Sequence, residues 1–426
     1  MDITITPAPL HGRTTPPPSK SQAHRLLLAA ALAEGQSTVE NVAFSQDITA
    51  TLHCLQTLGA QAAVDGSTVT IRGIGCRRGS RSCMLDMPEL DCGESGSTLR
   101  FLIPVAAVVA GRACFTGRGR LLQRPQGPYE TLFAEKGVSF AHTDTAIYIR
   151  GTLEPGLYRL PGNVSSQFFT GLLYALSLLN GSSVIQSTTS LESRDYIRMT
   201  IQSLEKFGVH VQEDGSCFLI PGGETLQAAR VRVEADWSQA GFWYAAQGMG
   251  NPVIPDGLRA DSLQPDRCIA EFSRRLKQPG EAVLDVSGCP DLVPPLAAQA
   301  ALRAGQTTQL VNAARLRMKE SDRLATVTAT LRAMGAQIEE YPDSLTIRGL
   351  DTLPGGVTVS ACNDHRIAMM AAVAASRCEK PVTVTGAECV AKSWPDFWQA
   401  YAALGGCLTG IEQAPAGSGT DPEPAT

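Results

Sequence analysis

Charged side chains crowd one short stretch of the sequence, RLRMKESDR, which spans residues 315–323. Basic residues this close together predict a site for a negatively charged ligand, and Glu320 keeps a carboxylate beside two of the cations. If the stretch is helical, Lys319 and Arg323 lie one turn apart and share a helix face. The alternative is a solvated helix surface whose charges pair with one another, the usual fate of such clusters. The pattern alone leaves both interpretations open.

Similar chemistry stands where several apolar segments begin. Ser, Asn and Asp at such positions are good helix N-caps by themselves. Lys or Arg is unfavourable at the positive start of a helix unless an anion is bound nearby. The repetition predicts that several helix starts converge on one polyanionic ligand. The residues are Ser19, Lys20, Ser21 and Arg25 in PSKSQAHRLLL, Arg100 in GESGSTLRFLI, Asn163, Ser165, Ser166 and Gln167 in GNVSSQFFTGLL, and Asn363, Asp364, His365 and Arg366 in ACNDHRIAMMAAVAA.

The composition is that of a globular protein with a large core. The chain has 426 residues, of which 43% are hydrophobic, and a formal net charge of −5, which argues against nucleic-acid binding. No apolar run reaches the roughly 18 residues of a membrane helix, and the start MDITITPAPLHGR lacks a leader pattern, so a cytoplasmic location is expected. The cysteines have no CxxC spacing, and P-loop and dinucleotide motifs are missing from the sequence. No metal and no cofactor are therefore expected.

A recurring pattern organises the chain. A helix end, a Gly turn and two strands are predicted in four clear copies, at 54–73, 131–151, 203–222 and 330–349, with weaker copies at 272–288 and 400–407. Long apolar runs between the copies predict buried core helices. Six helix-and-sheet units indicate an α/β (α+β) protein of two domains with three units each. The Pro- and Gly-rich residues 412–426 are predicted to be a disordered tail.

Taken in order, these segments resemble the enolpyruvyl transferases, and within them the branch that acts on shikimate 3-phosphate. The motifs are SKSQAHR, CGESGSTLRF, RPQGP, PGNVSSQFFTGLL, LESRDYI, CPDLVPPLA, RMKESDRL, NDHRIAMM and AKSWPDF, which cover nearly the whole chain. The resemblance implies two inverted domains, with the N-termini of the buried helices facing the interdomain cleft. Residues 1–16 and 233–411 would form one domain and 17–232 the other. Members of the family are generally monomeric.

The resemblance also implies the reaction and the residues that carry it. The 5-hydroxyl of shikimate 3-phosphate would attack phosphoenolpyruvate, and phosphate would leave. Asp291 is expected to take the hydroxyl proton, Glu320 to protonate the methylene carbon, and Lys20 to stabilise developing charge. Shikimate 3-phosphate is expected at Lys20, Ser21, Arg25, Ser165, Ser166, Gln167, Ser193, Asp291 and Lys319. Phosphoenolpyruvate is expected at Lys20, Gly96, Arg124, Gln167, Arg323, Arg366 and Lys392.

Two positions depart from the family pattern, and two other functions are weighed. Glu94 and Arg315 stand where many relatives have Asn, so neither is assigned a contact with substrate. The sister enzymes, which transfer enolpyruvyl to a UDP-linked amino sugar, usually carry a Cys where this chain has Gly119. A non-catalytic anion-binding protein on the same fold is the second alternative. Asp291 also has a simpler interpretation, as the cap of an apolar helix.

Overall fold

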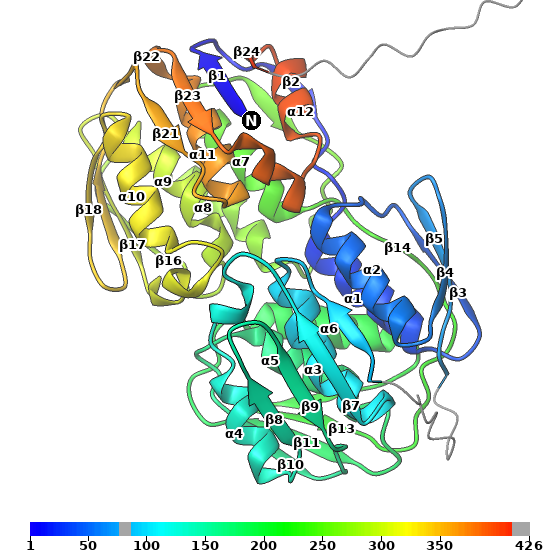
Figure 1. Cartoon of the computed structure of the whole chain (residues 1–426). Helices are drawn as coiled ribbons and strands as arrows, with labels where there is room; N and C mark the ends of the chain where they lie inside the picture. Colours follow the sequence, from blue (N-terminus) through cyan, green and yellow to red (C-terminus); the bar gives the residue numbers. More distant parts are fainter. Residues whose placement is uncertain (76–86, 411–426) are drawn as a thin grey trace, which may run out of the picture.

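The computed structural model describes residues 1–75 and 87–410, which form two lobes (Figure 1). Each lobe has its own hydrophobic core. The core of the middle lobe comes from residues between Ala23 and Val233, whereas the core of the end lobe combines Ile3, Ile5 and Leu10 with residues from Trp237 to Leu404. Both ends of the described chain therefore belong to one lobe. The predicted tail at 412–426 lies outside the described residues.

Five four-stranded sheets share one pattern, in which the first two strands are parallel and the following neighbours are antiparallel. In the middle lobe their strand orders are β14 (Arg230–Arg232), β3 (Gln36–Glu40), β5 (Thr68–Arg72), β4 (Gln61–Asp65); β6 (Glu89–Asp91), β7 (Arg112–Thr116), β9 (Ile147–Arg150), β8 (Ser139–His142); and β10 (Leu157–Leu160), β11 (Ser183–Ser187), β13 (Cys217–Ile220), β12 (Gln212–Asp214). In the end lobe they are β16 (Ala282–Asp285), β17 (Thr307–Val311), β19 (Leu345–Arg348), β18 (Gln337–Glu340); and β21 (Thr358–Ser360), β23 (Val382–Thr385), β1 (Asp2–Thr6), β24 (Cys407–Thr409).

The four clear sequence copies are confirmed as a helix followed by an antiparallel hairpin. The hairpins are β4–β5, β8–β9, β12–β13 and β18–β19. The helices before them are α2 (Gln46–Thr57), α4 (Gly127–Glu135), α6 (Arg194–Lys206) and α10 (Arg323–Ala333). The repeated glycine after each helix has a positive φ, from 68° at Gly137 to 109° at Gly59, which side chains rarely adopt. This requirement explains why the same residue recurs.

The two weaker copies have different outcomes. At 272–288, α8 (Ile269–Leu276) is followed by the single strand β16, which pairs in parallel with β17, so the predicted hairpin is wrong. Pro290 begins a 3-10 helix soon after β16, and proline cannot continue a paired strand. At the other copy, α12 (Phe397–Ala403) leads into β24, which pairs with β1 from the opposite end of the chain. Strand β1 also pairs with β23, and the two pairings complete the fifth sheet. The blue arrow of β1 lies beside orange β23 in Figure 1.

The predicted core helices are confirmed, and they carry the residues of interest at their starts. They are α1 (Lys20–Leu32), α3 (Gly96–Val109), α5 (Ser166–Leu176), α9 (Val293–Ala301) and α11 (His365–Ala375), joined by α7 (Trp237–Gly248). Nearly all of their residues are buried. Helices α3 and α5 are in close contact, because a Cβ at Gly171 would lie 2.4 Å from the carbonyl oxygen of Arg100. In the described part of the chain, no helix combines the length and the apolar character needed to span a membrane.

Short strand pairs and 3-10 helices complete the end lobe. Strand β2 (Gly12–Thr14) pairs in parallel with β15 (Val253–Pro255), and β20 (Leu353–Gly355) with β22 (Cys378–Lys380). Further 3-10 helices include Ala314–Met318, directly before the charged stretch, and Ala387–Lys392. These two bring charged side chains to the boundary between the lobes.

Candidate active site

The starts of several buried helices converge on one pocket that is lined by residues of both lobes. Each start is capped by a polar side chain that accepts hydrogen bonds from the first turn: Ser19 for α1, Ser95 for α3, Ser165 for α5, Asp236 for α7 and Asp364 for α11. Apart from Lys392, every residue that the resemblance assigned to the reaction or to a substrate lines this pocket. These are Lys20, Ser21, Arg25, Gly96, Arg124, Ser165, Ser166, Gln167, Ser193, Asp291, Lys319, Glu320, Arg323 and Arg366.

The charged stretch is not one helix, so the prediction that Lys319 and Arg323 share a helix face is wrong. Lys319 ends the preceding 3-10 helix in an extended conformation, with φ −92° and ψ −161°. Helix α10 begins only at Arg323, because the carboxylate of Asp322 accepts a hydrogen bond from the backbone N–H of Ala325. Both cations nevertheless reach one carboxylate: Lys319 Nζ is 3.6 Å and Arg323 Nη1 is 2.8 Å from Oδ1 of Asp291. The solvated-surface alternative fails as well, since Arg323 is 1% exposed.

Asp291 is the carboxylate on which cations concentrate. It lies in the 3-10 helix Pro290–Leu292, and its carboxylate oxygens accept hydrogen bonds from Arg323 and Arg366. Its Oδ2 lies 3.1 Å from Nη2 of Arg366, in addition to its contacts with Lys319 and Arg323. Burial alone would raise its pKa, but the charges of Arg366, Lys319 and Arg323 outweigh it and hold the pKa of Asp291 well below its usual range. Asp291 is therefore ionised in this pocket.

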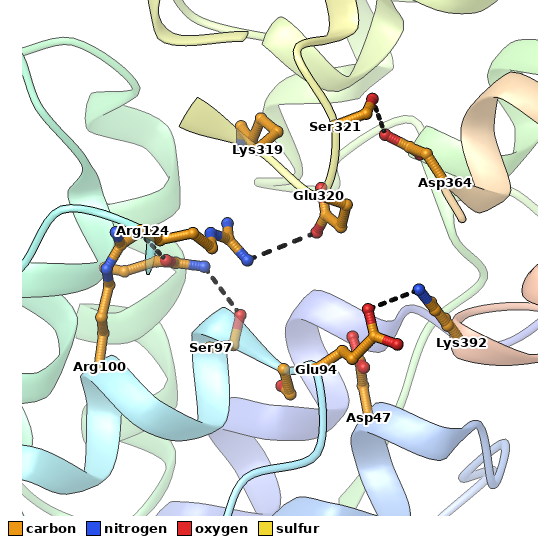
Figure 2. A network of polar contacts seen from close by, with 12 residues as sticks. Asp47, Glu94, Ser97, Arg100, Arg124, Lys319, Glu320, Ser321, Asp364 and Lys392 are labelled. Carbon is orange, nitrogen blue, oxygen red and sulfur yellow. Dashed lines mark hydrogen bonds and ion pairs between the residues drawn. The ribbon is translucent and has the colours of Figure 1, made fainter. Parts of the chain in front are cut away.

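Glu320 faces cations from both lobes. Its Oε2 is 2.6 Å from Nη2 of Arg323, and its Oε1 is 3.7 Å from Nη1 of Arg124 in the middle lobe (Figure 2). Burial favours the protonated acid, but Arg323 and Arg124 outweigh burial, so the pKa of Glu320 lies well below its usual range. Arg323 also donates to Asp364 at 2.8 Å, so that one guanidinium joins three carboxylates. Asp364 in turn accepts from Ser321, which fixes the backbone beside Glu320.

Gln167 and Arg124 are held in place by neighbours on α3. Arg100 Nη1 donates to Oε1 of Gln167 at 2.9 Å, and this contact orients the amide so that its NH2 group donates to Ser97 Oγ at 3.0 Å. The guanidinium of Arg124 lies against the backbone of Gly96, where a Cβ would stand 2.5 Å from Nη1. A side chain at this position would have to displace the guanidinium of Arg124.

Lys20 and Arg25 open the pocket from α1. Lys20 Nζ forms a 2.7 Å ion pair with Asp47 of α2, and its backbone N–H donates to Asp236 at 3.0 Å. Arg25 is buried and donates to Thr200 and to the carbonyl oxygens of Ser21 and Tyr196. Burial lowers the pKa of Arg25 to about 10, so its guanidinium remains charged at neutral pH.

Arg315 joins the lobes at the edge of the pocket. Its Nε lies 2.5 Å from Oε2 of Glu192, and its Nη2 donates to Ser193 Oγ at 2.8 Å and to the carbonyl oxygen of Ser287. Ser193 has a left-handed backbone, with φ 54° and ψ 39°, which is uncommon outside glycine. The sequence assigned no contact to Arg315, yet it lines the pocket and orients a predicted site residue.

Lys392 is the predicted site residue that does not line the pocket. Its ammonium group is 2.7 Å from Oε2 of Glu94 and donates to the carbonyl oxygen of Asn363, also at 2.7 Å. Glu94 belongs to the middle lobe and Lys392 to the end lobe, so this pair crosses the boundary between the lobes (Figure 2). Asn363 Nδ2 donates to both carboxylate oxygens of Glu94, at 3.2 and 3.1 Å.

Comparisons with known proteins show the family to which the chain belongs. A family model described as EPSP synthase (3-phosphoshikimate 1-carboxyvinyltransferase) matches residues 5–401. The chain belongs to the EPSP synthase family. The 3-phosphoshikimate 1-carboxyvinyltransferase of Clostridium kluyveri is 42% identical, over 95% of this chain and 97% of that protein. The protein of the same name from Clostridioides difficile is 39% identical, over 95% and 97%.

A solved EPSP synthase from Acinetobacter baumannii has the same fold as this chain. The TM-score is 0.78 at 24% sequence identity, over 96% of this chain and 100% of that one. The predicted two-domain α/β fold is thereby confirmed. Membership of the EPSP synthase family confirms the prediction of an enolpyruvyl-transferring enzyme of the shikimate pathway. The alternative of a non-catalytic protein loses its support.

Several pocket residues were not singled out from the sequence of this EPSP synthase family member. Asp47 and Asp236 contact Lys20 from distant positions in the chain. Asp236 caps α7, which is a local signal, but no local pattern links either residue to Lys20. Tyr196 lies within the quoted motif LESRDYI, which could have indicated it. Burial and the charge of Lys20 lower the pKa of His365 well below the usual value, so its imidazole is neutral.

Proposed function

We propose that the chain transfers the enolpyruvyl group of phosphoenolpyruvate to the 5-hydroxyl of shikimate 3-phosphate and releases phosphate. The observation that carries the proposal is the cationic pocket with two carboxylates, Asp291 and Glu320, at its centre. Two anionic substrates bring several phosphate and carboxylate groups to one place. A net-acidic chain can bind them only by concentrating its cations locally.

The substrate contacts follow from the motifs and are supported by the shared pocket. Shikimate 3-phosphate is assigned to Lys20, Ser21, Arg25, Ser165, Ser166, Gln167, Ser193, Asp291 and Lys319. Phosphoenolpyruvate is assigned to Lys20, Gly96, Arg124, Gln167, Arg323, Arg366 and Lys392. Arginine suits these contacts because its planar fork donates two parallel hydrogen bonds to a carboxylate or phosphate. The helix starts of α1, α3, α5 and α11 add their positive ends.

In the reaction, Asp291 accepts the proton of the 5-hydroxyl as its oxygen attacks the central carbon of phosphoenolpyruvate. Glu320 gives a proton to the methylene carbon, which becomes a methyl group in the tetrahedral intermediate. Phosphate then leaves with the proton held by Asp291, and a methyl proton returns to Glu320, which restores the double bond and both carboxyl groups. Lys20 stabilises negative charge that develops on the reacting groups. No step needs a metal or a cofactor.

The ionised Asp291 is ready to accept a proton, whereas Glu320 must first gain the proton that it gives to the methylene carbon. Without ligand, Arg323, Arg124, Arg366 and Lys319 neutralise Asp291 and Glu320 and hold their pKa values low. Substrate anions bind the same cations and add negative charge near the two carboxylates. Both changes raise the pKa of the carboxylates toward the neutral range, in which a group can accept and return a proton.

The decisive experiment follows phosphate release by the purified protein with phosphoenolpyruvate and shikimate 3-phosphate. A parallel reaction replaces shikimate 3-phosphate with the UDP-linked amino sugar. We expect release only with shikimate 3-phosphate. Release only with the UDP-sugar would keep the chemistry and overturn the substrate, whereas release with neither, from folded protein, would overturn the proposed reaction.

We also propose domain limits of 1–16 with 233–411 and of 17–232, supported by the two separate hydrophobic cores. Strand β1 pairs with β23 and β24, in agreement with a domain built from both chain ends. A monomer and a cytoplasmic location remain predictions. Sedimentation of the purified protein, with and without both substrates, tests the first of these.

A further inference from the structure

Glu94 contacts a cation that the proposed reaction assigns to substrate. Its carboxylate is 2.7 Å from the ammonium group of Lys392, the predicted phosphoenolpyruvate ligand that does not line the pocket. The side chain of Lys392 is 5% exposed, so this cation is almost fully removed from water. A buried ammonium group requires a negative partner, and Glu94 provides it in the ligand-free protein.

Besides Lys392, two uncharged residues hold the Glu94 carboxylate in this place. The amide of Asn363 donates to both of its oxygens, and Asn363 itself has a strained φ of 54°. Gly119 lies on the other side, where a Cβ would be 2.6 Å from Oε2 of Glu94 and φ is +58°. The space filled by the carboxylate therefore depends on a glycine in the neighbouring loop.

The side chain of Glu94 is also able to move away from Lys392. Its side chain is 27% exposed, and its backbone lies between Gly93, with φ +57°, and the cap of α3 at Ser95. Of the three ammonium protons of Lys392, one faces Glu94 and one the carbonyl oxygen of Asn363. A phosphate or carboxylate group of the substrate that binds the ammonium group of Lys392 would lie beside the Glu94 carboxylate. Two like charges in contact repel each other.

We propose that Glu94 is an internal anion that occupies Lys392 in the empty site and sets the affinity of the enzyme for phosphoenolpyruvate. The inference rests on the proposed function. The carboxylate of Glu94 takes the place that an oxygen of phosphoenolpyruvate takes in the complex, and binding exchanges one anion for the other on Lys392. The affinity for phosphoenolpyruvate is reduced by the free energy of the Glu94–Lys392 contact. Shikimate 3-phosphate, which is assigned to other residues, does not compete with Glu94.

The test is the steady-state kinetics of Glu94→Gln, which keeps the size of the side chain and one acceptor oxygen and removes its charge. We expect the KM for phosphoenolpyruvate to fall about tenfold at low ionic strength, with the KM for shikimate 3-phosphate unchanged and kcat within about twofold. Inhibition by inorganic phosphate, competitive with phosphoenolpyruvate, should strengthen in parallel. A residue that only supported the fold would not lower one KM selectively.

Glu388→Gln is the matched control. It removes one negative charge four positions from Lys392 in the chain, but Glu388 pairs with the N-terminal ammonium group at 2.7 Å and does not line the pocket. We expect both KM values to stay unchanged in this variant. Glu94→Asp gives a second test, since the shorter carboxylate reaches Lys392 poorly and should lower the KM for phosphoenolpyruvate in the same direction.

An unchanged or raised KM for phosphoenolpyruvate in both Glu94 variants, with an active wild-type enzyme, would overturn this inference alone. An equal fall in the Glu388→Gln control would attribute the effect to overall charge and would overturn it too. A wild-type protein without phosphate release would instead contradict the proposed function. The two failures are therefore distinguishable in one set of assays.

Discussion

Arg323 Nη1 lies 2.8 Å from Oδ1 of Asp291. Arg323 is 1% exposed and is the first residue of helix α10, a position where a cation is unfavourable. The same side chain contacts Glu320 and Asp364. Despite burial, which opposes the charge, these three carboxylates raise the pKa of Arg323 above its usual value. One buried cation thus assembles acidic groups from three separate segments of the chain.

Replacement of Arg323 by Gln should be strongly destabilising. The carboxylates of Asp291, Glu320 and Asp364 would lose their shared counter-charge, and breaking a buried charge network costs about 3–5 kcal/mol. Arg317→Gln is the control, because Arg317 pairs with Asp322 and Glu340 while 30% exposed and should cost about 1 kcal/mol or less. Urea unfolding measures both variants. Equal midpoints for the two would contradict the central role of Arg323.

Asp291→Asn tests the assignment of the base. An amide cannot accept the hydroxyl proton, so kcat should fall about 100- to 10,000-fold. Asp285→Asn is the matched control on the same segment, since the Asp285 carboxylate contacts Asn312 and Ser287 and does not line the pocket. Circular dichroism establishes that both variants fold. Near-normal turnover in Asp291→Asn would remove Asp291 from the proton transfer.

The pair of Tyr196 and Asp266 makes a prediction for the pH dependence of stability. The Tyr196 hydroxyl donates to Asp266 Oδ2 at 2.6 Å across the lobe boundary, and Asp266 is 2% exposed. Burial, with the negative charge of Asp291 adding to it, raises the pKa of Asp266 to about 7. The folded state therefore holds this proton more tightly than the unfolded chain. Its contribution to stability is complete below about pH 4 and is lost as the pH rises to about 7.

Asp266→Asn removes this dependence, because the amide oxygen still accepts from Tyr196 and carries no charge. Relative to wild type, the variant should gain stability between pH 5 and pH 8, by roughly 4 kcal/mol at most. Asp261→Asn should show the opposite sign, since the hydrogen bond from Arg259 lowers the pKa of exposed Asp261. Urea unfolding at several pH values measures both. A constant difference between wild type and Asp266→Asn would contradict the prediction.

The comparison of sequence and structure separates local from long-range information. Ser19 before Lys20 and Asp364 before His365 were predictable as caps because a cap depends on neighbours in the chain. The break between Lys319 and Arg323 was missed, since the helical spacing was extended through Asp322, which caps the next helix. The resemblance supplied the residues that meet in the pocket, which spacing alone could not have brought together.

The contacts across the lobe boundary could not be predicted. Arg315 forms an ion pair with Glu192, which lies more than a hundred positions away in the chain, and Glu94 forms one with Lys392, nearly three hundred positions away. Both depend on how the lobes meet, which no periodicity encodes. These are also the two positions at which the chain departs from the family pattern, so a departure in sequence here coincides with an added contact between the lobes.

The approach of Arg124 to Gly96 gives the last prediction. In Gly96→Ala the new Cβ would stand 2.5 Å from Nη1, 2.8 Å from Cζ and 3.0 Å from Nη2 of Arg124. The far end of a flexible side chain can move, so the fold should tolerate the methyl group with a loss of about 1 kcal/mol or less. The guanidinium, however, must leave the position from which it also faces Glu320, 3.7 Å away.

Because Arg124 is assigned to phosphoenolpyruvate, this displacement should raise the KM for phosphoenolpyruvate roughly tenfold and leave that for shikimate 3-phosphate unchanged. Gly127→Ala is the matched control, since a Cβ there meets no atom within 4 Å. Glu94→Gln and Gly96→Ala lie two residues apart in the chain and should change the KM for phosphoenolpyruvate in opposite directions. Equal kinetics in Gly96→Ala and wild type would mean that Arg124 does not bind this substrate in the position it holds without ligand.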